Sequence, residues 1–223
     1  MAKRVKKTEE EARQWREAEL INKFNLTRIV TYQTPLMQEW LDVLPPELNV
    51  GEQYIFDKTF SKIVQNITGW NEEDLKMKFI SPTLELGNMT DDGGVVGYFD
   101  KTISATVDDT RLTVKSDFMM AKGLLDVFET PYFHFQVYKP YKDRIGDAMG
   151  ELLAMLPVAQ ERNKNEKPLY GVEIMGTNWC FVVMKGREYC ISKSLIVTKK
   201  DDLLKIIAIL RKFRHILETQ LMD

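Results

Sequence analysis

The chain has 223 residues, of which 44% are hydrophobic and 29% are charged, and its formal net charge is −2. This composition allows one sizeable core, and the slightly acidic balance gives no support to a protein that grips duplex DNA over a long footprint. No stretch approaches the roughly 20 apolar residues that a membrane-spanning helix needs, and the basic N-terminus lacks the apolar region of a secretory signal. We therefore expect a cytoplasmic protein without a membrane partner.

The first 86 residues predict a helical extension. Residues 7–25 carry acidic and basic side chains at helical spacing with few apolar ones, which is typical of a solvated helix that packs on the main body or on a second subunit. Residues 34–86 continue the helical pattern between prolines and glycines. We expect residues 1–86 to pack on a core of residues 87–223 as one compact domain, with the N-terminal helix as the candidate contact of a homo-oligomer.

The pattern changes to β-structure after the turn signal Asp91-Asp92-Gly93-Gly94. Residues 95–107 and 112–121 are rich in β-branched and aromatic side chains, and they predict a long hairpin. A strand, a helix, a strand, a hairpin and a helix are expected to follow, at residues 133–139, 146–163, 168–174, 179–192 and 201–221. Pro157 lies inside the first of these helices and predicts a kink or an earlier end. The order indicates one α/β domain with an N-terminal helical extension.

The cysteines and histidines do not predict a zinc site. Cys180 and Cys190 lie on two adjacent expected strands, whereas His134 and His215 lie far from each other in the sequence. In a cytosolic chain such thiols stay reduced, and we interpret them as small buried hydrophobes.

Asp117 and Lys139 form a candidate site on neighbouring expected strands. Asp117 lies in Val114-Lys115-Ser116-Asp117-Phe118, and Lys139 lies in Gln136-Val137-Tyr138-Lys139-Pro140. With the element order, this pair resembles the PD-(D/E)XK nuclease-like superfamily, which includes restriction endonucleases and the nuclease end of type I restriction motor subunits. The resemblance covers about residues 93–192. It implies a restriction-endonuclease-like αβββαβ core with a mixed sheet, followed here by an extra C-terminal hairpin and helix.

The resemblance also implies a chemistry for this pair. An acid and a lysine two residues apart on a strand share one face, and an aspartate from the next strand completes a divalent-cation site. Carboxylates and water then hold Mg²⁺, while the lysine orients the attacking water or stabilises charge on the phosphate. The implied catalytic residues are Asp117 and Lys139, and Asp117 is the implied metal ligand.

Val137 breaks this pattern, because it stands where the acid before Lys139 is expected and cannot ligate a cation. Gln136 offers a carbonyl oxygen as a metal ligand, but a regular strand aims it at the opposite face unless a bulge turns it back. Alternatively, the acid has migrated to Asp147 or Glu151 on the following helix. The sequence leaves these substitutes open.

Two classes of function follow from these observations. The leading hypothesis is a nuclease-like protein of bacterial type, either a Mg²⁺-dependent DNA endonuclease or a catalytically impaired relative. The alternative is a non-enzymatic module that uses the same fold to bind nucleic acid or to assemble with protein. A small-molecule binding domain is a third option. The sequence motifs of serine hydrolases, zinc proteases and dinucleotide-binding folds are absent.

Overall fold

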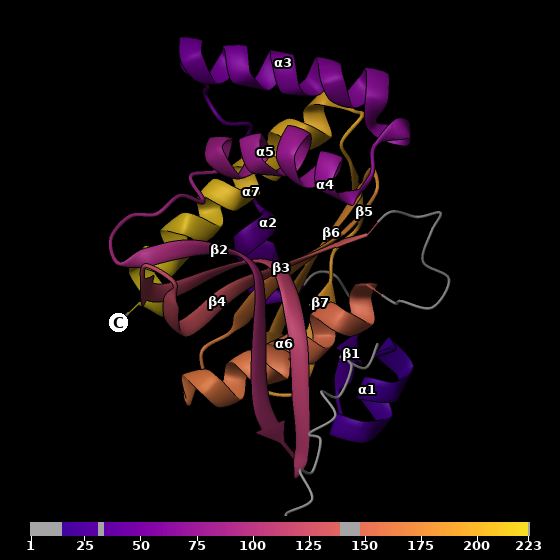
Figure 1. Ribbon diagram of the computed structural model, residues 1–223, viewed down its shortest axis with the longest axis vertical. Helices are drawn as coiled ribbons and strands as arrows, with labels where there is room; N and C mark the ends of the chain where they lie inside the picture. The colour runs from indigo at the N-terminus through magenta and orange to yellow at the C-terminus, as the bar shows by residue number, and fades with distance from the viewer. Residues whose placement is uncertain (1–14, 31–33, 139–147, 223) are drawn as a thin grey trace, which may run out of the picture.

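The computed structural model describes residues 15–30, 34–138 and 148–222. Within these ranges, eight strands form one mixed sheet with helices on both faces (Figure 1). The strands are β1 (Thr27–Ile29), β2 (Val95–Val107), β3 (Thr110–Leu124), β4 (Val127–Tyr138), β5 (Leu169–Met175), β6 (Asn178–Lys185), β7 (Glu188–Ile191) and β8 (Leu195–Ile196). Their order is β1-β7-β6-β5-β4-β3-β2, and β8 pairs with β6. The predicted α/β class with a mixed sheet is confirmed.

One end of the sheet is an antiparallel meander of β2, β3 and β4, and the next strand, β5, is parallel to β4. In the meander, Phe118 of β3 pairs with Phe99 of β2 on one side and with Phe135 of β4 on the other. Helix α6 (Ala148–Asn163) precedes β5, which runs parallel to β4 with Tyr170 opposite Phe133. Parallel neighbours need a crossover connection, and α6 lies in that connection. The predicted order of three strands, helix, strand and hairpin is therefore observed.

The remaining helices lie before β2 and after β8 in the chain. They are α1 (Glu17–Phe24), α2 (Pro35–Leu41), α3 (Val50–Asn66), the 3₁₀ turn η1 (Ile67–Gly69), α4 (Glu72–Leu75), the π-helical turn η2 (Lys76–Ile80), α5 (Ser81–Leu86), α7 (Lys200–Ile216) and the π-helical turn η3 (Leu217–Leu221). Side-chain caps define where two of these helices begin. Asn49 and Glu52 form a reciprocal capping box at α3, and Asn71 and Asp74 form another at α4.

Each face of the sheet carries its own apolar core. On one face, α2, α3, α5 and α7 pack with buried side chains of β4, β5 and β6, including Phe133, Tyr170 and Phe181. On the other face, α1 and α6 pack against β2, β3 and β6. Helix α6 approaches the residues before α1 so closely that a Cβ on Gly150 would lie 2.1 Å from the carbonyl oxygen of Trp15. Only glycine fits this contact.

The residues before position 87 complete both the cores and the sheet. Trp40 of α2 is fully buried, with its ring against Phe133, Tyr170, Phe181 and Phe213, and its indole Nε1 donates to the carbonyl oxygen of Ile209 at 3.1 Å. β1 joins the sheet edge by parallel pairing with β7. These contacts bind the N-terminal segment to the C-terminal helix and hairpin.

Some boundaries differ from the sequence-based expectations. β4 begins at Val127 instead of residue 133, because the strand continues through Pro131 with irregular register against β3. β1 and β8 were not predicted, since two or three residues carry no periodic pattern. Helix α6 continues past Pro157 to Asn163, so an earlier end at the proline is wrong.

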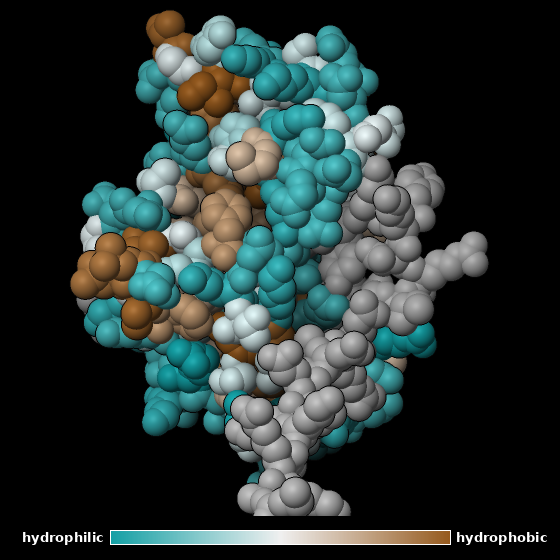
Figure 2. All heavy atoms as spheres, viewed as in Figure 1, coloured by the Kyte–Doolittle hydropathy of each residue, from teal (hydrophilic) through white to brown (hydrophobic). Residues whose placement is uncertain are grey.

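The surface is largely hydrophilic in the view of Figure 2, with local apolar patches. One patch lies at the turn between β3 and β4, where Leu124, Leu125 and Val127 are exposed. Cys180 and Cys190 are free thiols. In the part of the chain that the structure describes, no helix combines the length and apolar character needed to cross a membrane.

Candidate functional site

Asp117 lies buried on β3 and forms an ion pair with a lysine that sequence reasoning did not single out. Its carboxylate Oδ1 is 2.7 Å from the Nζ atom of Lys76, and the two side chains are only 9% and 8% exposed. Lys76 opens the π-helical turn η2, which follows α4 directly. The helical segment before the meander therefore supplies the partner of the predicted first acid.

Lys76 contacts two further carboxylates. Its ammonium is 2.8 Å from Glu72, one turn earlier in the same helical segment, and 3.3 Å from Asp100 on β2. Burial alone would lower the pKa of Lys76, but the bonds to Asp117 and Glu72 outweigh it and raise this pKa well above the ordinary value. Lys76 is thus held in its charged form.

Asp100 connects this group to the outer hairpin. The register of β2 and β3 pairs Phe99 with Phe118 and Lys101 with Ser116, so Asp100 and Asp117 lie across from each other. Asp100 has a positive φ of 53° and accepts a second ion pair from Lys115 at 2.9 Å. Burial works to raise the pKa of Asp100, but Lys115 and Lys76 outweigh it and lower this pKa. We call Glu72, Lys76, Asp100, Lys115 and Asp117 the Lys76 cluster.

Gln136, the second predicted metal ligand, faces α6. It is buried, and its amide Nε2 donates to the Oε2 atom of Glu151 at 2.9 Å. The pairing of β4 with β5 is regular from Phe133 to Tyr138, so no bulge turns Gln136 within this stretch. The structure therefore brings Gln136 together with Glu151, one of the two candidates for a migrated acid, in the arrangement expected of a regular strand.

Two predicted site residues, Lys139 and Asp147, lie outside the described residues. Val137 lies within β4, where its backbone pairs with Ile174 of β5. The predicted grouping of Asp117 with Lys139 thus remains a prediction. Phe118 opposite Phe135 is the last pair of β3 and β4 at this end of the ladder. Asp117 precedes Phe118 on β3, and Gln136 follows Phe135 on β4.

A buried histidine lies on the α6 face of β4, two residues before Gln136. His134 is completely buried, its Nδ1 lies 3.4 Å from the Oγ of Ser116, and its Nε2 has no hydrogen-bond partner among the described residues. Burial lowers the pKa of His134 to about 3, so the ring is neutral at physiological pH. A neutral, enclosed imidazole without access to solvent is a structural group.

The sequence carried weak signals for the residues that were missed. Glu72 and Lys76 have the four-residue spacing of a helical ion pair, but acids such as Glu72 to Asp74 are also typical of the first turn of any helix. Asp100 lies inside an expected strand and belongs to no motif, so the sequence gives no reason to select it. The pair of Glu72 and Lys76 meets Asp100 only through tertiary contact, which the sequence alone does not reveal.

The described residues offer no ready divalent-cation site. Among residues 15–30, 34–138 and 148–222, no three histidine, cysteine or acidic side chains are placed to hold a metal ion. Asp117 already bonds an ammonium, and Glu151 already accepts from Gln136. In the Lys76 cluster, the lysine ammonium groups offset the negative charge of the three carboxylates. The most buried acid, Asp117, already has the Lys76 ammonium where a metal ion would bind.

Comparisons with known proteins give no family for this chain. No protein family model matches it, and no curated protein matches its sequence.

Proposed function

We propose that the chain is a PD-(D/E)XK nuclease-like protein with a restriction-endonuclease-like αβββαβ core. The support is topological: α5, the β2–β3–β4 meander, α6 and the parallel strand β5 follow one another in the order of that core. Asp117 lies on the second strand of this series, as the first acid of the family does. Mg²⁺ and nucleic acid are the cofactor and partner that this assignment implies.

We infer further that the protein is a catalytically impaired relative. The observation that carries this inference is the buried ion pair of 2.7 Å between Asp117 and Lys76. A divalent cation at Asp117 would have to displace or repel an ammonium held by three carboxylates, and Val137 supplies no second acid. The described residues therefore do not fit Mg²⁺, and we assign no metal-dependent step to them.

A cleavage assay tests the inference. The protein is incubated with supercoiled plasmid and Mg²⁺ or Mn²⁺, and Mn²⁺ uptake is measured by calorimetry. We expect neither nicking nor uptake in the wild type. Metal-dependent nicking that disappears in Asp117→Asn would contradict the impairment, provided that Asp126→Asn, which changes an exposed acid at the turn between β3 and β4, cleaves like the wild type.

A restoration experiment separates the two parts of the proposal. Val137→Glu alone should not bind Mn²⁺, because the Lys76 ammonium still occupies the Asp117 carboxylate. Val137→Glu combined with Lys76→Met should bind one Mn²⁺, whereas Val137→Gln with Lys76→Met should not. Folded protein without Mn²⁺ uptake in the first double variant would argue against the nuclease-like assignment and leave a non-enzymatic binding or assembly module.

A further inference from the structure

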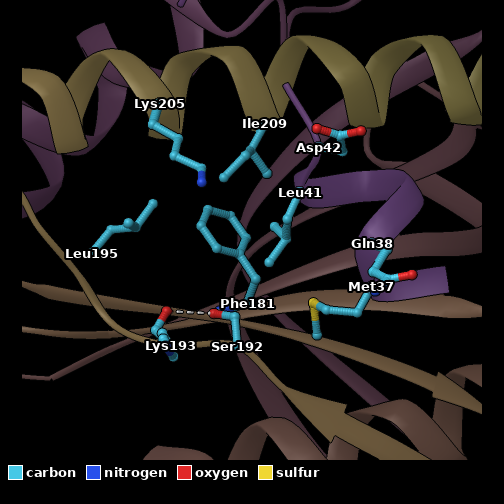
Figure 3. Close-up of a pocket in the computed structure, with 10 residues that line it drawn as sticks. All are labelled: Met37, Gln38, Leu41, Asp42, Phe181, Ser192, Lys193, Leu195, Lys205 and Ile209. Carbon is cyan, nitrogen blue, oxygen red and sulfur yellow. Dashed lines mark hydrogen bonds between the residues drawn. The ribbon is translucent and has the colours of Figure 1, made fainter. Parts of the chain in front are cut away.

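A pocket lies on the face of the sheet that Trp40 covers, because its lining residues Phe181 and Ile209 belong to the same core. It has a volume of about 440 Å³ and opens between α2 and α7 above β6 (Figure 3). Its lining combines apolar and polar residues: Met37, Gln38, Leu41, Asp42, Phe181, Ser192, Lys193, Leu195, Lys205 and Ile209. None of them belongs to the Lys76 cluster, so an inference drawn here does not rest on the nuclease-like assignment.

The walls of this pocket are fixed by the core beneath them. The bond from Trp40 Nε1 to the carbonyl oxygen of Ile209 ties α2 to α7, so the two helical walls keep their spacing. On the floor, the Ser192 hydroxyl accepts from the backbone N–H of Phe181 at 2.9 Å and donates to the carbonyl oxygen of Lys193 at 2.8 Å. A pocket of this size with tied walls is preformed, as small-molecule sites usually are.

The apolar part of the lining is continuous. Figure 3 shows the Phe181 ring in the middle of the pocket, with Leu41 and Ile209 beside it and Leu195 across from them. Leu41 and Leu195 are half-buried, which leaves part of each side chain open to an occupant. A flat or branched apolar group placed here would cover this surface and exclude water from it.

The polar part of the pocket carries an unpaired positive charge. Figure 3 shows the Lys205 ammonium turned from α7 toward the Phe181 ring. Lys205 forms no ion pair or hydrogen bond with any residue that the structure describes. Lys193 lies on the floor beside Ser192, and Asp42 is the one acid of the lining, on the far rim beside α2. The end of the pocket at Lys205 therefore favours an anion.

We propose that this pocket binds a small organic anion with a compact apolar body, of the class of aromatic or branched carboxylates. The apolar body lies against Phe181, Leu41 and Leu195, and the carboxylate accepts from the Lys205 ammonium. The apolar walls supply most of the affinity, and Lys205 supplies the preference for an anion over a neutral molecule of the same shape.

The test uses 2-naphthoate as the probe and the uncharged 2-naphthylmethanol as its matched neutral analogue. Binding to the full chain is followed by NMR of ¹³C-labelled methyl groups. We expect saturable shifts of the methyl signals of Met37, Leu41, Leu195 and Ile209 with 2-naphthoate. The signals of Leu124 and Leu125, at the exposed turn between β3 and β4, should not move.

Charge variants then decide between specific and general binding. Lys205→Gln should weaken 2-naphthoate binding by about two- to fivefold and leave 2-naphthylmethanol unchanged. Lys199→Gln, which removes an exposed lysine outside the pocket lining, should alter neither. Equal binding of both probes by the wild type, an unchanged affinity in Lys205→Gln, or the absence of saturable shifts at these methyl groups would each overturn the proposal.

Discussion

Lys76 and Lys205 are two lysines of the same chain that use their charge in opposite ways. Lys76 is almost completely buried and meets three carboxylates within 3.3 Å, whereas Lys205 is exposed at a pocket and meets none among the described residues. A buried ammonium must be neutralised by the protein itself, because water is not there to solvate it. An exposed one keeps its charge free for a ligand. The Lys76 ammonium is therefore paired within the protein, whereas the Lys205 ammonium is available to a ligand.

The largest change in stability is expected when Lys76 is replaced. Lys76→Met removes the ammonium that bridges Asp117, Glu72 and Asp100, which should lower the free energy of unfolding by about 3–5 kcal/mol. Urea denaturation followed by circular dichroism measures this change. The double variant Lys76→Met/Asp117→Asn should recover more than half of the loss, and a loss below about 1 kcal/mol in the single variant would show that the pair is loosely held.

Raising the pH tests the same pair without a mutation. The pKa of Lys76 is raised in the folded protein, so its contribution is fully present below the unfolded pKa near 10.5 and declines as pH rises toward the folded pKa. The wild type should therefore lose stability above this pH more steeply than Lys76→Met. Thermal melts at pH 9, 10 and 11 give the comparison, and parallel slopes would speak against the raised pKa.

His134 extends the comparison to a buried ionisable group without a charged partner. Because burial lowers its pKa from 6.5 to about 3, the unfolded chain binds a proton in this range that the folded chain does not. Stability due to the neutral ring is therefore present above pH 6.5 and falls, by about 1.4 kcal/mol per pH unit, as pH drops toward 3. His134→Asn should flatten this part of the stability–pH curve, measured by urea denaturation between pH 3 and 7, and an unchanged slope would contradict the lowered pKa of His134.

A smaller loss of stability is expected when Trp40, which ties the two helices beside the pocket, is replaced. Trp40→Phe keeps an aromatic ring in the core but removes the donor to the carbonyl oxygen of Ile209, which should cost about 1–2 kcal/mol. The same variant should loosen the spacing of α2 and α7 and weaken 2-naphthoate binding. Denaturant unfolding and the methyl NMR titration measure the two effects, and a destabilised variant with unchanged binding would show that the pocket does not depend on this bond.

The smallest effect is expected at Lys205. Because its ammonium pairs with no described residue, Lys205→Gln should change the free energy of unfolding by less than about 0.5 kcal/mol. Its consequence should be confined to ligand binding. A destabilisation as large as that of Lys76→Met would remove the distinction between the two lysines.

Patterns that repeat along the chain were readable from the sequence. Apolar residues recur every second position in stretches of the hairpin of β2 and β3, and at about every 3.6 positions in the helices α6 and α7. These repeats predicted that the elements exist and in which order they follow. Asp117 lies on the second strand of this hairpin, where the sequence pattern placed it. The chemistry around that acid was not readable.

The missing part depends on contacts between distant residues. Lys76 precedes Asp117 by 41 residues, and nothing in the sequence between them states that the turn after α4 lies against β3. Trp40 reaches Ile209 across 169 residues, so a segment that the sequence assigns to a helical extension fills the core. Local periodicity reports which face of an element is apolar, but not which other element covers it.

The parallel pairing of β1 with β7 also constrains the order in which the molecule folds. Arg187 donates to the carbonyl oxygen of Phe24 across 163 residues, and Thr27 pairs with Glu188 at the same place. Pairing two strands so far apart in the chain closes a long loop, which costs conformational entropy and slows folding. During synthesis, the segment around β1 leaves the ribosome long before β7 exists, so we expect this edge of the sheet to be completed late.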